Sequence, residues 1–176
     1  MNTTMFSSYR ELLARIDIFA GQLAARHGKL IACGPGCAGC CRQVLELLPV
    51  EFYYLQATVR KLSLPRPAAA AAAEVCPLLD DGLCLLYEYR PVICRTHGMP
   101  LLMEADGGQW VDCCPENFTS VRLRDLPGDS LLHLERVNLL LVSINHVFAA
   151  ASGLDARQRL SMEHIFSRDT LVDCHI

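Results

Sequence analysis

The chain has 176 residues, 52% of them hydrophobic, which suits a single domain over residues 1–176 with one core. Its 16 basic and 19 acidic residues give a formal net charge of -3, which disfavours nucleic acid and anionic membranes as partners. The sequence does not open with a basic segment and a long apolar run, so we expect no signal peptide and a cytoplasmic protein.

Helical periodicity predicts the first element over residues 7–27, where apolar side chains recur on one face and His27-Gly28 marks the end. A second helix is expected from Pro49, because proline suits a first helical turn and the stretch that follows repeats apolar residues at helical spacing. The alanine run after Pro67 has no large side chain to pack, which indicates a short exposed helix or spacer.

The helical period vanishes over residues 76–117. Within this stretch "DDG" at 80–82 and "ADGG" at 105–108 are typical of turns between short strands. These signals predict short β-hairpins in the middle third of the chain.

After this stretch, we expect Asp129 or Ser130 to cap a long helix that extends to about Ala151. The polar residues within this helix argue against a membrane span. The pattern of residues 154–167 predicts a last amphipathic helix. The expected fold class is therefore mainly α (α+β): a helical scaffold with an irregular cysteine-rich metal-binding insertion and short β-hairpins.

The ten cysteines make up roughly 6% of the chain, below the level that alone marks a disulfide scaffold. A reducing cytoplasm favours metal or redox chemistry for clustered thiols, although buried reduced cysteines can also pack as small hydrophobes. Four cysteines fall in "CGPGCAGCC", whose glycines let several sulfurs converge on one centre. The expected metal ligands are Cys33, Cys37, Cys40, Cys41, Cys76, Cys84, Cys94, Cys113 and Cys114.

Two later segments, "CPLLDDGLCLLYEYRPVICRTHG" and "DCCPEN", complete a pattern that resembles the CxxCxxCC or YkgJ-like cysteine-cluster family, described as zinc- or iron-chelating domains. The resemblance covers residues 33–115 and implies a metal-binding core there. One departure is the first gap, which has three residues where the family name implies two, so Cys33 fits the pattern less well. The matching positions are the "CC" pair followed by Arg42, then Cys76-Pro77, Leu79, Gly82, Cys84, Tyr87, Arg90-Pro91, Cys94 and Arg95.

Arginines accompany the cysteines. Four thiolates around a dication leave a net negative centre, which Arg42, Arg90 and Arg95 could offset from beside the ligands; ordinary salt bridges are the alternative role. His97 stands three residues after Cys94, at a spacing that allows a mixed thiolate and imidazole site or a turn cap. At the C-terminus, Cys174 beside His175 is expected to be a free thiol.

Three functional readings follow from the thiols. An iron–sulfur cluster of the 4Fe–4S type is favoured slightly, because the Cys-Pro steps at 76–77 and 114–115 resemble those of cluster proteins. Zinc is the alternative, in a structural or interaction module whose partner the sequence does not identify. A third reading is a radical S-adenosylmethionine enzyme, because Cys33, Cys37 and Cys40 have the C-x3-C-x2-C spacing; Gly39 replaces its usual aromatic residue, and no alternation of strands and helices predicts its barrel.

Nine cysteines between positions 33 and 114 exceed what one four-coordinate site can use. Adjacent residues rarely direct both side chains at one metal, so we expect the pairs Cys40-Cys41 and Cys113-Cys114 to be divided. Either their members serve two neighbouring centres, or one member binds and the other packs beside it. The three cysteine groups are expected to converge.

Overall fold

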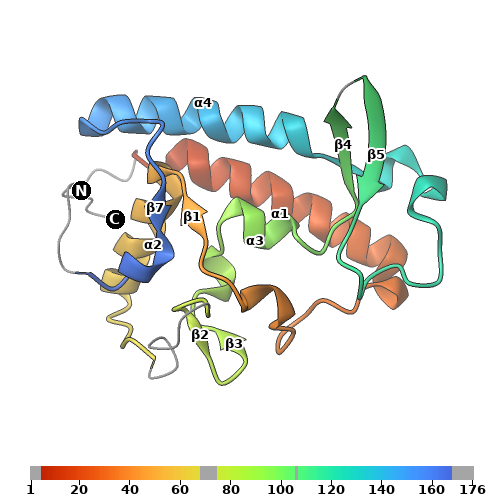
Figure 1. Cartoon of the computed structure of the whole chain (residues 1–176), viewed down its shortest axis with the longest axis horizontal. Helices are drawn as coiled ribbons and strands as arrows, with labels where there is room; N and C mark the ends of the chain where they lie inside the picture. The colour runs from red at the N-terminus through yellow and green to blue at the C-terminus, as the bar shows by residue number, and fades with distance from the viewer. Residues whose placement is uncertain (1–4, 68–74, 106, 168–176) are drawn as a thin grey trace.

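The computed structural model describes residues 5–67, 75–105 and 107–167. Two long helices, α1 (Ser7–His27) and α4 (Leu134–Ser152), lie one above the other along the molecule, and α2 (Pro49–Lys61) stands at one end of them (Figure 1). The five-residue α3 (Val92–Thr96) contacts α1 near the centre. Across the described helices, none has the length and apolar character needed to cross a membrane.

The strands form small separate sheets beside this helical scaffold, so the mixed α+β class is confirmed. In the largest sheet, β4 (Leu101–Ala105) pairs antiparallel with β5 (Gly108–Asp112) and parallel with β6 (Leu132–His133). The other two sheets are antiparallel pairs: β1 (Glu46–Leu47) with β7 (Leu160–Ser161), and β2 (Leu79–Asp80) with β3 (Leu83–Cys84).

Both predicted hairpins are confirmed. Asp81 and Gly82 connect β2 to β3 with φ of 45° and 76°, the two positive values that a type I′ turn requires. Glycine adopts this conformation at no steric cost, and the turn sets Cys84 opposite Leu79. The second hairpin pairs β4 with β5, and Ala105 lies opposite Gly108 at its end.

The core lies where α1, α2 and α4 meet. α1 buries one stripe that includes Tyr9, Leu12 and Ile16, as its periodicity predicts. α2 is buried from Pro49 to Val59, on all sides rather than on one stripe. Asn145 of α4 satisfies the first turn of α2, because its Oδ1 accepts a hydrogen bond of 3.1 Å from the backbone N–H of Val50. This packing holds the cysteine loop that precedes α2.

Two helix predictions near the C-terminus need correction. α4 begins at Leu134 rather than at Asp129 or Ser130, because the preceding residues pair with β4 and the N–H of Leu132 donates to the carbonyl of Pro100 at 2.9 Å. The helix predicted over 154–167 is wrong. Its middle forms β7 and a short 3-10 turn, since the N–H of Met162 donates to Leu45 in the first half of the chain.

Two other differences concern the middle of the chain. α3 is helical inside the stretch 76–117, where no helical period was evident. Its five residues are too few to establish a periodic apolar stripe. The alanine run predicted to form an exposed helix or spacer falls mainly on 68–74, outside the described residues.

Candidate metal centre

The first cysteine loop is built from two consecutive turns. The N–H of Cys37 donates to the carbonyl of Gly34 at 3.0 Å, with Pro35 second and Gly36 third in the turn. Gly36 has a φ of +88°, the positive value that the third position of a type II turn needs. The next turn closes when the N–H of Cys41 donates to Ala38 at 3.0 Å. These turns present the thiols at intervals around a tight loop.

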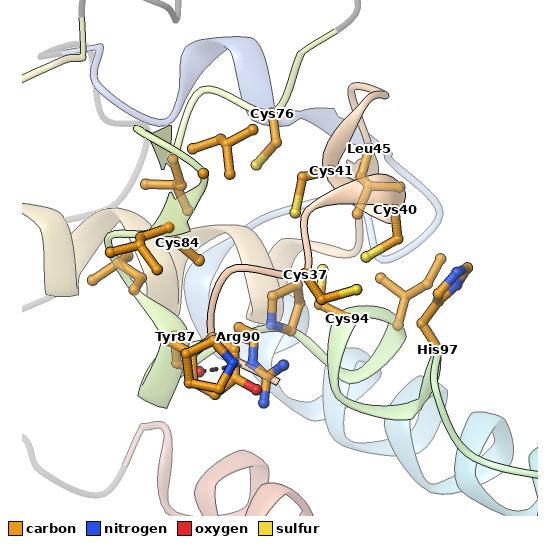
Figure 2. A pocket seen from close by; sticks show the side chains of 18 of the residues that line it. Cys37, Cys40, Cys41, Leu45, Cys76, Cys84, Tyr87, Arg90, Cys94 and His97 are labelled. Atoms are coloured by element: carbon orange, nitrogen blue, oxygen red, sulfur yellow. Dashed lines mark hydrogen bonds between the residues drawn. The ribbon is translucent and has the colours of Figure 1, made fainter. Parts of the chain in front are cut away.

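A cavity of about 290 Å³ lies between this loop and the β2–β3 hairpin (Figure 2). Figure 2 shows the adjacent Cys40 and Cys41 of the first loop, together with Cys76 and Cys94 from two other segments, reaching into it. Much of the remaining wall is apolar and includes Leu45, Leu78 and Met162. The thiols along it are those of Cys37, Cys40, Cys41, Cys76, Cys84 and Cys94.

Backbone contacts hold the cavity's thiols in place. The N–H of Cys76 donates to the carbonyl of Cys41 at 2.8 Å, which joins the first cysteine group to the second. Cys94 is positioned by α3, whose first N–H, on Val92, donates to Oε1 of Glu51 at 3.0 Å. Glu51 is only 4% exposed, and this burial raises its pKa. The carboxyl of α2 thus caps the helix that carries Cys94.

Burial is the main cause of raised pKa values among these thiols. It raises the pKa of Cys41 to about 12, and the neighbouring Cys40 and Cys76 add to the effect. The pKa of Cys94 is raised by burial first, then by Cys76, Cys41, Cys84 and Cys40 in that order. Each ionised thiol therefore disfavours the ionisation of its neighbours, so a bound cation would relieve the repulsion between the thiolates.

The three arginines occupy different surroundings. Arg90 lines the cavity, and its guanidinium carbon lies 3.5 Å from the centre of the Tyr87 ring. Burial raises the pKa of Cys84, and the positive charge of Arg90 offsets part of that increase. Arg95 points elsewhere: its side chain is 6% exposed and donates to Asp17 and to the carbonyls of Glu88 and Arg90. Arg42 is exposed and lines a separate hollow that contains no described cysteine. Of the three arginines, Arg90 lines the main cavity, whereas Arg95 lines only a smaller hollow, which it shares with Cys37, Cys40 and Cys94.

A second group of thiols lies outside the lining of that cavity. Cys33 and Cys113 both contact Gly98: a Cβ added to Gly98 would stand 2.8 Å from Sγ of Cys33, and Sγ of Cys113 donates to the Gly98 carbonyl at 3.3 Å. Burial is the main cause of the raised pKa of Cys33 and of Cys113, and the charge of a Cys114 thiolate raises both further, while the Cys114 backbone N–H lowers that of Cys113. The third cysteine group therefore meets Cys33 rather than the cavity.

Asn117 is the residue that sequence reasoning missed. It is 4% exposed, and its Oδ1 accepts from the N–H groups of Ala32 and Cys33 at 2.8 and 3.1 Å. Its Nδ2 donates to the carbonyl of Gly98 at 2.6 Å and to Sγ of Cys33 at 3.2 Å. Its place three residues after Cys114 was visible, but nothing local indicates that it ties three segments together.

The remaining candidates fall into place as follows. His97 is exposed at the rim of the cavity, and Cys37 lies on its wall. Cys40 and Cys41 line the same cavity, so this pair is not divided between the two groups. Cys174 and His175 lie outside the described residues.

The fold does not match the radical-enzyme reading, although Cys33, Cys37 and Cys40 line one small hollow together with Cys94. Over residues 5–67, 75–105 and 107–167 the sheets have two or three strands, which is not the parallel barrel of that enzyme class.

In the described part of the chain, no three His, Cys, Asp or Glu side chains form a ready-made site for a single metal ion. Comparisons with protein-family models, curated proteins and solved structures find no match for this chain. The chemistry and placement of the thiols are therefore the basis for assigning a function.

Proposed function

We propose that the chain binds a 4Fe–4S cluster through thiolates drawn from Cys40, Cys41, Cys76, Cys84 and Cys94. The observation that carries this proposal is that these thiols, from segments far apart in sequence, line one cavity. Soft thiolate donors suit iron–sulfur clusters and zinc, whereas carboxylates and carbonyls suit harder ions. A bound cluster would supply one-electron transfer, and Arg90 would offset part of the negative charge.

The size of the cavity supports a cluster over a single zinc ion. Zinc with four thiolates at about 2.3 Å would hold the sulfurs about 3.8 Å apart around one point. Here the thiols instead line a cavity of about 290 Å³, which is more space than one ion needs. A multi-atom cluster would use more of that space. Zinc remains the alternative, as the metal of a structural module.

The same residues carry the resemblance to the YkgJ-like cysteine-cluster family, so we propose this chain as a relative of that family. Support comes from two matched positions, Cys84 and Arg90, which the fold brings to one cavity although neither is adjacent in sequence to the first loop. We propose the cytoplasm as its compartment, since a reducing environment keeps the thiols available for metal.

The test is metal analysis of full-length protein purified without oxygen or added metal. Iron and acid-labile sulfide should be present, with visible absorption that disappears on exposure to a chelator. Cys84→Ser and Cys94→Ser should each lose the iron, because they remove cavity thiols from β3 and α3. Cys174→Ser is the matched control, expected to keep wild-type iron. Less than about half an equivalent of iron plus zinc per chain would refute metal binding altogether.

A further inference from the structure

We infer that the exposed face of α4 is the contact surface of a homodimer, in which a second copy of this chain packs antiparallel on the same helix. Residues 137–152 contain no Asp, Glu, Lys or Arg. Four large apolar side chains in this stretch, Leu139, Leu140, Val142 and Val147, are between 40% and 73% exposed. Apolar surface gathered on one element in this way marks an interaction site, whereas single exposed apolar residues do not.

The opposite face of α4 is already used in the core. Val137, Leu141 and Phe148 are buried, and α1 lies along the inner side of the helix (Figure 1). A helix that is apolar on all sides is normally buried on all sides. The outer face of α4 thus has the composition of a core face, yet it is exposed in the described part of the chain.

One stripe of the outer face combines a projecting side chain with a hollow. Leu140, Ser143 and Val147 follow one another at helical spacing, so they lie on one side of α4. A hollow of about 440 Å³ opens beside Val147, between α4 and the start of α1, and Ser8 forms part of its wall. The Ser143 hydroxyl donates to the carbonyl of Leu139 at 2.8 Å, so it keeps its hydrogen bond when the stripe is covered.

Self-complementarity selects a second copy as the occupant. A two-fold dimer uses the same patch on both subunits, so that if residue i contacts residue j, then j also contacts i. An antiparallel crossing between Ser143 and Ile144 sets Leu140 of each copy opposite Val147 of the other, at the hollow beside it. Leu140 and Val147 are seven residues apart, which is about two helical turns, so both contacts form on the same side of the helix pair.

The charges at the helix ends fit the same arrangement. Arg136 is exposed one turn before Leu140, and the antiparallel crossing sets it beside Ala151 in the last turn of the partner's α4. That last turn has no basic side chain of its own, and a positive charge there stabilises the unpaired carbonyls of the helix end. A membrane surface fits less well, because helices that lie on membranes are rich in Lys and Arg, whereas the described α4 contains one arginine and no lysine.

The experiment measures the mass of the full-length protein by sedimentation equilibrium over a range of concentrations. Wild type should form a species of twice the 19.5 kDa chain mass. Val147→Glu and Leu140→Glu should each raise the dimer dissociation constant at least about tenfold, because each places a carboxylate in an apolar contact. Ile18→Glu is the matched control on α1, where the side chain is 63% exposed, and should keep the wild-type constant.

The antiparallel register has its own test. The double variant Leu140→Glu/Val147→Lys brings opposite charges together across the two-fold axis, so it should dimerise more tightly than Leu140→Glu or Val147→Lys alone. A parallel pairing would bring like charges together and weaken the double variant further. Circular dichroism checks that each variant is folded, and Val147→Ser removes the same apolar contact without adding a charge.

Four results would overturn the homodimer. One is a wild-type monomer at every concentration, and another is a dimer whose dissociation constant is unchanged in both Val147→Glu and Leu140→Glu. The third is a monomer that binds phosphatidylcholine vesicles and loses this binding in Val147→Glu, which would make the face a membrane contact. The fourth is a monomer that dimerises only after removal of residues 168–176, which would mean that this segment covers the face.

The dimer and the proposed cluster can fail independently. The described residues that line the thiol cavity come from parts of the chain other than α4. Val147→Glu should therefore keep the iron and visible absorption of wild type while it loses the dimer. Conversely, loss of iron in Cys84→Ser should leave the dimer dissociation constant unchanged.

Discussion

Asn117 offers a sharp test of how the cysteine segments are held together, because its side chain alone bonds to both the Ala32–Cys33 segment and Gly98. Replacing it with alanine removes three hydrogen bonds to neutral backbone groups and one to the Cys33 sulfur. At about 1 kcal/mol for each neutral bond, the free energy of unfolding should fall by roughly 3 kcal/mol. Solvent can reach the exposed Ala32 and Cys33 segment, so we expect a loss of about 2–3 kcal/mol.

Urea unfolding of wild type and Asn117→Ala, at the same saturating metal concentration, measures this loss. Amide exchange of Ala32 and Cys33 gives the local readout, since both N–H groups lose their acceptor and should exchange faster. Glu116→Ala is the matched control on the exposed neighbour and should change the free energy by less than about 0.5 kcal/mol. Wild-type stability and exchange rates in Asn117→Ala would refute the claim that this residue pins the loop.

Three further outcomes are expected. Burial raises the pKa of Cys41 and Cys113 to about 12, so in metal-free protein these thiols lose their protons at lower pH in the unfolded chain than in the folded one. The free energy of unfolding measured in urea should therefore decrease as the pH rises above about 9, and a value that does not change with pH there would contradict this. Arg95→Ala should lower the free energy of unfolding by about 2–4 kcal/mol, and with it the melting temperature, because the side chain bonds to Asp17 and to backbone carbonyls. The metal content should stay unchanged, and a loss of metal would instead place Arg95 at the metal centre. Asn145→Ala should lower the free energy of unfolding in urea by about 1–3 kcal/mol, because it removes the hydrogen bonds to the N–H of Val50 and to the carbonyl of Ala156. Asn138→Ala, at an exposed position of the same helix, is the control, and an equal effect of the two substitutions would refute the capping role of Asn145.

Local signals were enough to predict the helical scaffold and the hairpins. α1 occupies 7–27 and α2 begins at Pro49 as predicted, because apolar periodicity and proline chemistry act within a few residues. The β2–β3 turn was likewise predictable, since Asp81-Gly82 suits a type I′ turn in isolation. Thiol chemistry, too, could be expected from the spacing of the cysteines alone, although metal binding remains a proposal.

Tertiary structure decided which residues share a site. The segment 154–167 has a helical pattern, but its backbone pairs with Glu46–Leu47 and hydrogen-bonds to Leu45. These partners lie more than 100 residues away, and no local pattern reveals them. Arg95 resembles a partner for thiolates in sequence, yet its guanidinium faces Asp17 of α1. Gly98 and Asn117 bring Cys33 and the segment of Cys113 and Cys114 together, although these residues lie about 80 positions apart in the sequence. Side-chain type sets what each thiol can bind, whereas long-range backbone pairing and packing set which thiols can bind together.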